Sequence, residues 1–136
     1  MGGTGEVLTH EEIVFVNALM IEWTGGLSTG DENLLNPGSL DYILGACQGS
    51  YFGLDLYPTV IGKAVAIAER IMTAHVFHDG NKRTAMEVCR LMLERNGYHL
   101  QLDLEESLAV ALQVAKKQIT LEEFTLWITK RATPLT

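Results

Sequence analysis

Residues 75–85, near the middle of the chain, bring together an imidazole, a carboxylate and two cations. His75 supplies a group that can take a proton from a hydroxyl near neutral pH. The carboxylate of Asp79 is a hard oxygen ligand of the kind that Mg²⁺ prefers. The two cations, Lys82 and Arg83, follow directly and attract phosphate. A base, a metal ligand and cations at this spacing predict a site that transfers a phosphoryl or nucleotidyl group.

The residues before His75 have the spacing of an amphipathic helix. Pro58 is placed to begin this helix, because the fixed φ of proline suits a first turn. The apolar residues recur at intervals of three and four, and His75 comes next on the same face: Ile61, Ala64, Val65, Ala68, Ile71 and Met72. We therefore expect this helix to carry His75 at its C-terminal end.

A second helix is predicted after the acidic loop, from about Asn81 to Arg95, because Asn96-Gly97 is a good C-terminal signal. This helix is apolar on nearly all sides, which is typical of a central, buried element. The N-terminus of a helix presents unpaired N–H groups and positive dipole to an anion. Gly80, which has no side chain, lets the backbone approach a phosphate closely. The start of this helix is thus expected to bind phosphate.

The rest of the chain also has mostly helical periodicity. Three capping boxes predict helix starts, at Thr9 to Glu12, Asp103 to Glu106 and Thr120 to Glu123. The corresponding helices cover about residues 10–23, 104–116 and 121–130. Ser39 is placed to cap a short helix through about residue 47, and aromatic residues alternating with small ones favour an extended piece over 50–57. The predicted fold is all-α, a bundle of about six helices with a small flap or hairpin.

Composition restricts the class of protein. A length of 136 residues fits one domain, and 47% apolar with 20% charged residues excludes an intrinsically disordered chain. Because there is no long apolar run and no signal-peptide pattern, we expect a cytoplasmic protein without membrane contact. The 17 acidic and 10 basic residues give a net charge of −7, which argues against direct, non-specific binding of nucleic acid. Cys47 and Cys89 are expected to be reduced and buried.

The central segment resembles the signature of the Fic/Doc superfamily. The residues that match are His75-x-Phe77-x-Asp79-Gly80-Asn81-Lys82-Arg83-Thr84. The similarity extends to three further places, Leu40-Asp41-Tyr42, Tyr57-Pro58-Thr59 and Asn96-Gly97-Tyr98. The resemblance implies one Fic-like domain over residues 1–136, with its core at about 9–131.

Two positions depart from the pattern of the members that transfer nucleotidyl groups, H-x-F-x-[D/E]-G-N-G-R-x-x-R. Lys82 stands where they have Gly, and Met86 stands where they have a second Arg. Both departures are similar to the Doc (death-on-curing) branch. This resemblance implies a toxin that uses ATP to phosphorylate a Ser or Thr hydroxyl of a translation factor, elongation factor Tu for the prototype, and so inhibits translation. It also implies a small antitoxin protein as a partner.

The resemblance assigns a role to each residue of the motif. His75 would be the general base, Asp79 would bind Mg²⁺, and Arg83 would stabilise charge on the transferred group. Phe77 would anchor the loop in the core. The phosphates of ATP would bind to four consecutive residues, Gly80, Asn81, Lys82 and Arg83.

Two further segments resemble parts of the family. Residues 50–57 correspond to the flap that aligns a target segment by strand addition, with Tyr51 and Phe52 in contact with the target. Residues 28–33 match the pattern by which some Fic proteins inhibit themselves. Glu32 would lack its arginine partner there, because Met86 replaces that arginine. We interpret this second match as chance.

Three other functions remain open at this point. An adenylyltransferase of the Fic type would share the fold and transfer AMP to a protein hydroxyl, although Lys82 and Met86 argue against it. A catalytically silent binding module would have no need of the His75 and Asp79 pair. A metal-dependent hydrolase would use His75, His78 and Asp79 as ligands, although the adjacent cations would repel a metal ion.

Overall fold

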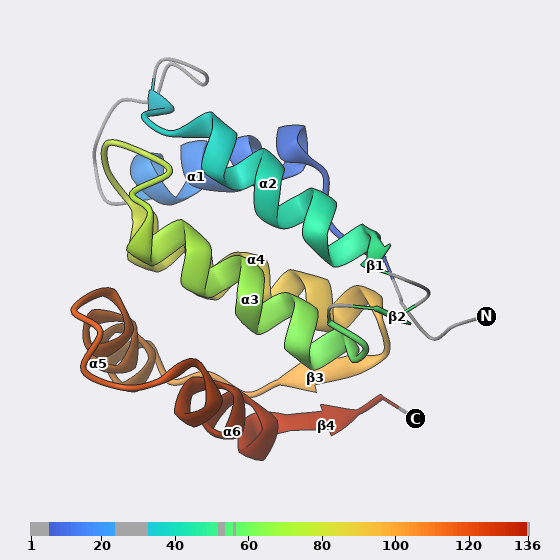
Figure 1. Cartoon of the computed structure of the whole chain (residues 1–136). Coiled ribbons are helices and arrows are strands. Elements are labelled where there is room, and N and C mark those ends of the chain that lie inside the picture. Colours follow the sequence, from blue (N-terminus) through green and yellow to red (C-terminus); the bar gives the residue numbers. More distant parts are fainter. Residues whose placement is uncertain (1–5, 24–32, 52–53, 56, 136) are drawn as a thin grey trace.

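The computed structural model of the chain describes residues 6–23, 33–51, 54–55 and 57–135 (Figure 1). These residues form six helices and two small antiparallel sheets. The helices are α1 (His10–Trp23), α2 (Pro37–Gln48), α3 (Val60–Thr73), α4 (Asn81–Arg95), α5 (Leu104–Ala115) and α6 (Leu121–Arg131). The strands are β1 (Ser50–Tyr51), β2 (Leu54–Asp55), β3 (Tyr98–Leu100) and β4 (Ala132–Pro134). The predicted all-α class, with six helices and a hairpin, is confirmed.

Helices α3 and α4 are the central pair of the bundle (Figure 1). They lie side by side, with α1 and α2 packed on one side and α5 and α6 on the other. The buried residues of α4 surround most of the helix, as the sequence predicts: Thr84, Ala85, Met86, Val88, Cys89, Met92 and Leu93. The loop that joins α3 to α4 contains residues 74–80. The two most buried helices therefore hold the candidate chemistry between them.

Two predicted helix starts are wrong. Helix α2 begins at Pro37 after the N-cap Asn36, two residues before the predicted cap Ser39. Helix α3 begins at Val60, because the side chain of Thr59 accepts a hydrogen bond from the N–H of Gly62. Pro58 therefore lies outside α3 and does not start it. In both cases a neighbouring residue provides the start, proline at the first helical position of α2 and a threonine cap in α3.

Residues 98–100 and 132–134 form a second sheet that the sequence analysis did not predict. Strand β3 pairs with β4 in antiparallel register, with His99 opposite Thr133. The hairpin of β1 and β2 is the predicted one, with Ser50 opposite Asp55. Strands of three residues have too little alternation to be recognised in a sequence. This second sheet joins the chain after α4 to the chain after α6.

Several polar groups lie inside the bundle. Lys63 on α3 is 1% exposed, and its ammonium group donates a hydrogen bond to the carbonyl oxygen of Tyr57. Cys47 and Cys89 are buried free thiols, as predicted. Burial raises the pKa of the Cys47 thiol to about 11 and that of the Cys89 thiol to about 12. Both thiols are therefore protonated and unreactive at neutral pH.

None of the helices described is long and apolar enough to cross a membrane.

An ion pair fastens the start of α1 to the end of α4. Arg95 donates a hydrogen bond to the carboxylate of Glu12 at 2.6 Å, and the backbone N–H of Thr9 donates a second at 2.9 Å. These two bonds lower the pKa of Glu12 from 4.5 to about 2, and the bond from Arg95 has the larger effect. A carboxyl whose pKa is lower in the folded than in the unfolded protein contributes its full stabilisation at pH values above the unfolded pKa. That contribution disappears as the pH falls through the folded pKa.

We predict that Glu12→Gln flattens the acid dependence of stability. The wild-type free energy of unfolding should fall between about pH 4.5 and pH 2 more steeply than that of the variant, because only the wild type loses this ion pair. Urea denaturation at several pH values measures the difference. Arg95→Gln, which removes the other partner, should flatten the same window. Parallel curves for all three proteins would contradict the assignment.

Candidate active site

The loop between α3 and α4 holds His75 in an unusual backbone conformation. Helix α3 ends at Thr73, and its C-cap is Ala74. His75 follows with a φ of 48°, in the left-handed region, which costs a non-glycine residue roughly 1–2 kcal/mol. Its side chain is exposed, whereas Val76 and Phe77 are buried. The sequence prediction that His75 continues the apolar face of the helix is therefore wrong, because the helix ends two residues earlier.

A second segment, residues 33–36, runs antiparallel beside this loop. The N–H groups of Leu35 and Asn36 both donate to the carbonyl of Val76, at 2.8 and 3.0 Å. The side-chain amide of Asn36 donates to the carbonyls of Ala74 and His75, at 2.8 and 3.0 Å. Asn36 is the N-cap residue of α2, yet its side chain makes no cap bond. These contacts hold His75 in its left-handed conformation and leave the imidazole in solvent.

Phe77 anchors the loop, as the resemblance implies, and Asn81 holds it there. The side-chain oxygen of Asn81 accepts from the N–H of Phe77 at 3.0 Å, and its amide nitrogen donates to the carbonyl of Phe77 at 2.7 Å. Phe77 itself is 1% exposed. The side chain of Asn81 is thus occupied by the backbone of the loop. What Asn81 can offer to a phosphate is its own backbone N–H.

The start of α4 forms a cradle for an anion. Gly80 is the N-cap with a φ of 79°, and it provides no side-chain cap. The first hydrogen bond back to the cap comes from Thr84, whose N–H donates to the carbonyl of Gly80 at 2.9 Å. Among the described residues nothing accepts from the N–H groups of the three positions between them, Asn81, Lys82 and Arg83. These unpaired groups and the helix dipole favour a bound phosphate.

Two full cations stand beside this cradle. Lys82 is exposed and Arg83 is half-buried. Both line an open cleft of about 470 Å³ together with Asp79, Gly80 and Asn81. The structure therefore brings together on one cleft the four residues expected to bind phosphate. A substrate phosphate in the cleft would meet backbone N–H groups and two positive side chains.

Asp79 lies at the mouth of the cradle with an exposed side chain. One carboxylate oxygen accepts the N–H of Gly80 at 2.8 Å, which orients the group, and the described residues provide no partner for the other oxygen. A single carboxylate beside a phosphate site fits Mg²⁺, which is usually bound through one or two carboxylates and substrate phosphates. No three His, Cys, Asp or Glu side chains of the described residues converge on a metal position. His75, His78 and Asp79 thus do not form a transition-metal centre of the kind that the hydrolase alternative needs.

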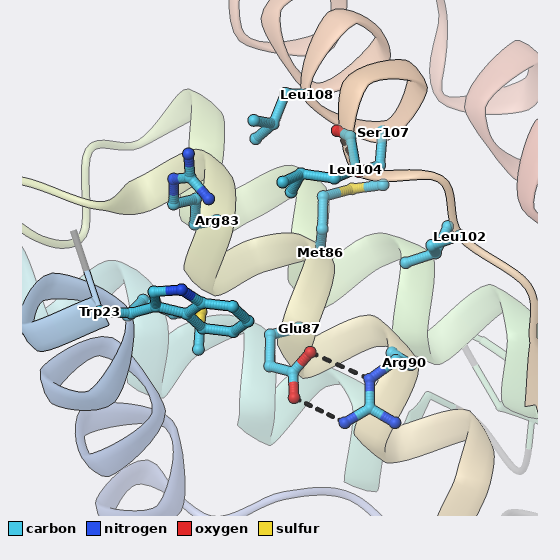
Figure 2. Close-up of a pocket in the computed structure, with 10 residues that line it drawn as sticks. Trp23, Arg83, Met86, Glu87, Arg90, Leu102, Leu104, Ser107 and Leu108 are labelled. Atoms are coloured by element: carbon cyan, nitrogen blue, oxygen red, sulfur yellow. Dashed lines mark hydrogen bonds and ion pairs between the residues drawn. The ribbon is translucent and has the colours of Figure 1, made fainter.

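A smaller cavity of about 200 Å³ adjoins the cleft (Figure 2). Arg83 lies at one end of it, and the ion pair of Glu87 and Arg90 lies at the other. Met86 points between them toward α5, where Leu104 and Ser107 form the opposite wall. Arg90 holds Glu87 with two hydrogen bonds, at 2.6 and 2.9 Å. The position of the second arginine in the nucleotidyl-transferring pattern is therefore filled by a buried thioether, which offers no charge to a phosphate.

The hairpin of β1 and β2 does not border this site. It precedes the N-terminal end of α3, whereas the loop 74–80 follows the C-terminal end of the same helix (Figure 1). The 14 residues of α3 separate the two by roughly 20 Å. The two strands of the segment expected to align a target by strand addition thus lie at the opposite end of α3 from His75. The side chains of Tyr51 and Phe52 and residues 28–32 with Glu32 lie outside what the structure describes.

Comparison with known proteins identifies the family. The sequence model of the Fic/DOC family matches residues 7–93, well over half of the chain, including the loop and most of α4. The chain belongs to the Fic/DOC family. One similar protein is Toxin Doc of Mycolicibacterium smegmatis, which is 33% identical over 82 residues. That match covers 60% of this chain and 63% of the relative, so it spans less than two thirds of the relative's length.

We predict that Asn81→Ala destabilises the fold through the loop. Both backbone groups of the buried Phe77 lose their partner, which should lower the free energy of unfolding by roughly 2 kcal/mol. Asn81→Asp keeps the acceptor for the N–H of Phe77, and the dipole of α4 favours its negative charge at the first helical position, so this variant should lose less stability than Asn81→Ala. Chemical denaturation of the three proteins measures the order. If Asn81→Ala unfolds at the same denaturant concentration as the wild type, the two hydrogen bonds between Asn81 and Phe77 contribute nothing to stability.

Proposed function

We propose that this chain is a Doc-type toxin and a protein kinase, which transfers the γ-phosphate of ATP to a Ser or Thr hydroxyl of a translation factor. The observation that carries the proposal is the phosphate cradle at the start of α4, with Lys82 and Arg83 beside it and Asp79 and His75 on the adjoining loop. The similarity to Toxin Doc supports the toxin part. Elongation factor Tu is the target that the family resemblance suggests.

The chemistry follows from the placement of these groups. His75 takes the proton from the acceptor hydroxyl as the oxygen forms its bond to the γ-phosphorus. The bond between that phosphorus and the bridging oxygen breaks, and ADP leaves. The N–H groups of the first turn of α4, with Arg83 and Lys82, stabilise the charge on the phosphoryl oxygens. Asp79 would hold Mg²⁺, which neutralises phosphate charge when bound.

The choice of the γ-phosphate depends on two residues. Transfer of AMP requires the terminal phosphates to be held away from the acceptor, and a second arginine would serve that purpose. Met86 occupies its position, is 4% exposed and carries no charge. Lys82 adds a side chain where the nucleotidyl-transferring pattern has glycine. ATP bound in the reverse sense places its γ-phosphate at His75, and this is the kinase arrangement.

A toxin of this class needs an inhibitor in its own cell. We propose a small antitoxin protein as the partner. The net charge of −7 makes the chain itself a poor ligand for nucleic acid, so any DNA contact would come from the partner. The site, the transfer reaction and the partner all belong to the cell interior, where ATP and the translation apparatus are found.

We predict that a protein in a cell extract becomes labelled from ATP carrying a γ-phosphate label, and not from ATP labelled at the α-phosphate. His75→Ala should lower this labelling by about 10²- to 10⁴-fold, because a positioned base is lost. Alanine also has a Cβ, so the variant keeps the left-handed backbone strain of the wild type. Labelling from the α-phosphate would mean AMP transfer. Labelling that survives in His75→Ala would exclude His75 as the base.

We also predict a specific metal dependence. Asp79→Asn keeps the shape of the side chain but loses its charge, so Mg²⁺ binding should weaken and the transfer should need a higher Mg²⁺ concentration. Removal of Mg²⁺ with a chelator should stop the wild-type reaction. The measurement is the initial rate of labelling against Mg²⁺ concentration for both proteins. Equal half-saturating concentrations would contradict the role of Asp79.

A further inference from the structure

A buried asparagine on α1 touches the loop that carries Asp79. Asn17 is 1% exposed and lies between Ile13 and Ile21 on the buried face of its helix. Its amide nitrogen donates to the carbonyl of Asp79 and to the hydroxyl oxygen of Thr84, both at 3.0 Å. A carbonyl oxygen can only accept, so the amide group must point its nitrogen toward Asp79. Both hydrogens of that nitrogen are thus used.

A second asparagine completes the arrangement. The amide nitrogen of Asn33 donates to the side-chain oxygen of Asn17 at 2.5 Å and to the carbonyl of Asp79 at 3.2 Å. The carbonyl of Asp79 therefore accepts from two side chains that come from two other parts of the chain. With Thr84 these residues form a network that fixes the peptide group directly after Asp79.

The peptide group so fixed is the one whose N–H orients the carboxylate. The N–H of Gly80 donates to a carboxylate oxygen of Asp79 at 2.8 Å. The carbonyl of the same peptide group is the acceptor in the bonds from Asn17 and Asn33. A rotation of this peptide group would turn the N–H away from the carboxylate and tilt the first turn of α4. A β-carbon added at Gly80 would lie 3.1 Å from the amide nitrogen of Asn17, so the packing is close as well.

We infer that Asn17, supported by Asn33, is a positioning residue that sets the direction of the Asp79 carboxylate toward the metal and phosphate site. Asn17 touches neither the reacting atoms nor the cleft. It acts through one peptide group, from a helix that contributes none of the motif residues. This inference rests on the proposed function only where it names Mg²⁺ and phosphate.

The test compares two asparagines of similar chemistry at different places. Asn17→Asp keeps the shape and the acceptor for Asn33, and its ionised carboxylate can donate neither of the two bonds. Asn96 is the matched control, because its amide nitrogen also donates to two backbone acceptors, the carbonyls of Glu6 and Met92, at 2.8 and 2.7 Å. It lies at the far end of α4 from Gly80. Both substitutions, Asn17→Asp and Asn96→Asp, should lower stability, and only the first should disturb the site.

The first readout needs no ligand and no activity. The amide of Gly80 should exchange its hydrogen about tenfold faster in Asn17→Asp than in the wild type, because its bond to Asp79 is no longer held in place. In Asn96→Asp the exchange of this amide should be unchanged under conditions where each protein is fully folded. Unchanged exchange in Asn17→Asp would overturn the inference, whatever the reaction proves to be.

The second readout connects the network to chemistry. In Asn17→Asp the kcat for transfer should fall roughly 10- to 100-fold through misplacement of Asp79, with a higher Mg²⁺ requirement and a nearly constant KM for the protein substrate. If the wild type transfers no phosphate, the proposed function fails, and the exchange measurement still decides the inference. If Asn17→Asp does not fold, the half-buried Asn33→Ala removes the supporting bonds and should shift both readouts in the same direction. Suppose that Asn17→Asp is unfolded and Asn33→Ala is folded. Wild-type amide exchange at Gly80 and wild-type kcat in Asn33→Ala would then contradict the inference.

Discussion

The uncapped first turn of α4 is the constraint on which the arrangement of the site depends. A helix normally pairs its first N–H groups with a side-chain cap, and α4 begins instead at a glycine with none. Leaving these groups for a ligand requires that the chain before them be held by other means. The clamp of Asn81 on Phe77 and the bonds of Asn36 to the loop serve this purpose. Asn36 uses its amide for the loop and does not cap α2, and Asn81 uses its amide for the loop and does not offer it to a ligand.

The same constraint explains why the site draws on distant parts of the chain. The motif lies within residues 75–84, and besides Asn81 the side chains that hold its loop come from α1 and from the segment before α2. An amide side chain suits this task, because it donates and accepts without the desolvation cost of a buried charge. The charged residues of the motif, Asp79, Lys82 and Arg83, are left to face the cleft. The neutral amides support the loop, and the charged side chains remain available to a ligand in the cleft.

The sequence predicts the parts of this structure that have local signals. The bounds of α4 agree with the prediction because a loop and an Asn-Gly signal mark its ends, and the buried position of Phe77 agrees with the motif. The motif does not indicate Asn17, and the one sequence signal for it is a polar residue between Ile13 and Ile21 on an apolar helix face. The conformation of His75 could not be read, because apolar periodicity says where a face lies and not where a helix ends. The pairing of β3 with β4 depends on residues more than 30 positions apart, which no local pattern reveals.

The left-handed backbone at His75 makes the residue type that is best for stability different from the one that the proposed reaction needs. Glycine adopts a φ of 48° without strain, so a glycine at this position would relieve the loop and deprive it of the imidazole. A substitution of His75 by glycine would therefore remove the proposed base, and selection for the proposed reaction would have to oppose it. A chain of this family that has lost its substrate would be expected to lose this histidine early. The residue at this position would then indicate whether a given lineage keeps the proposed reaction.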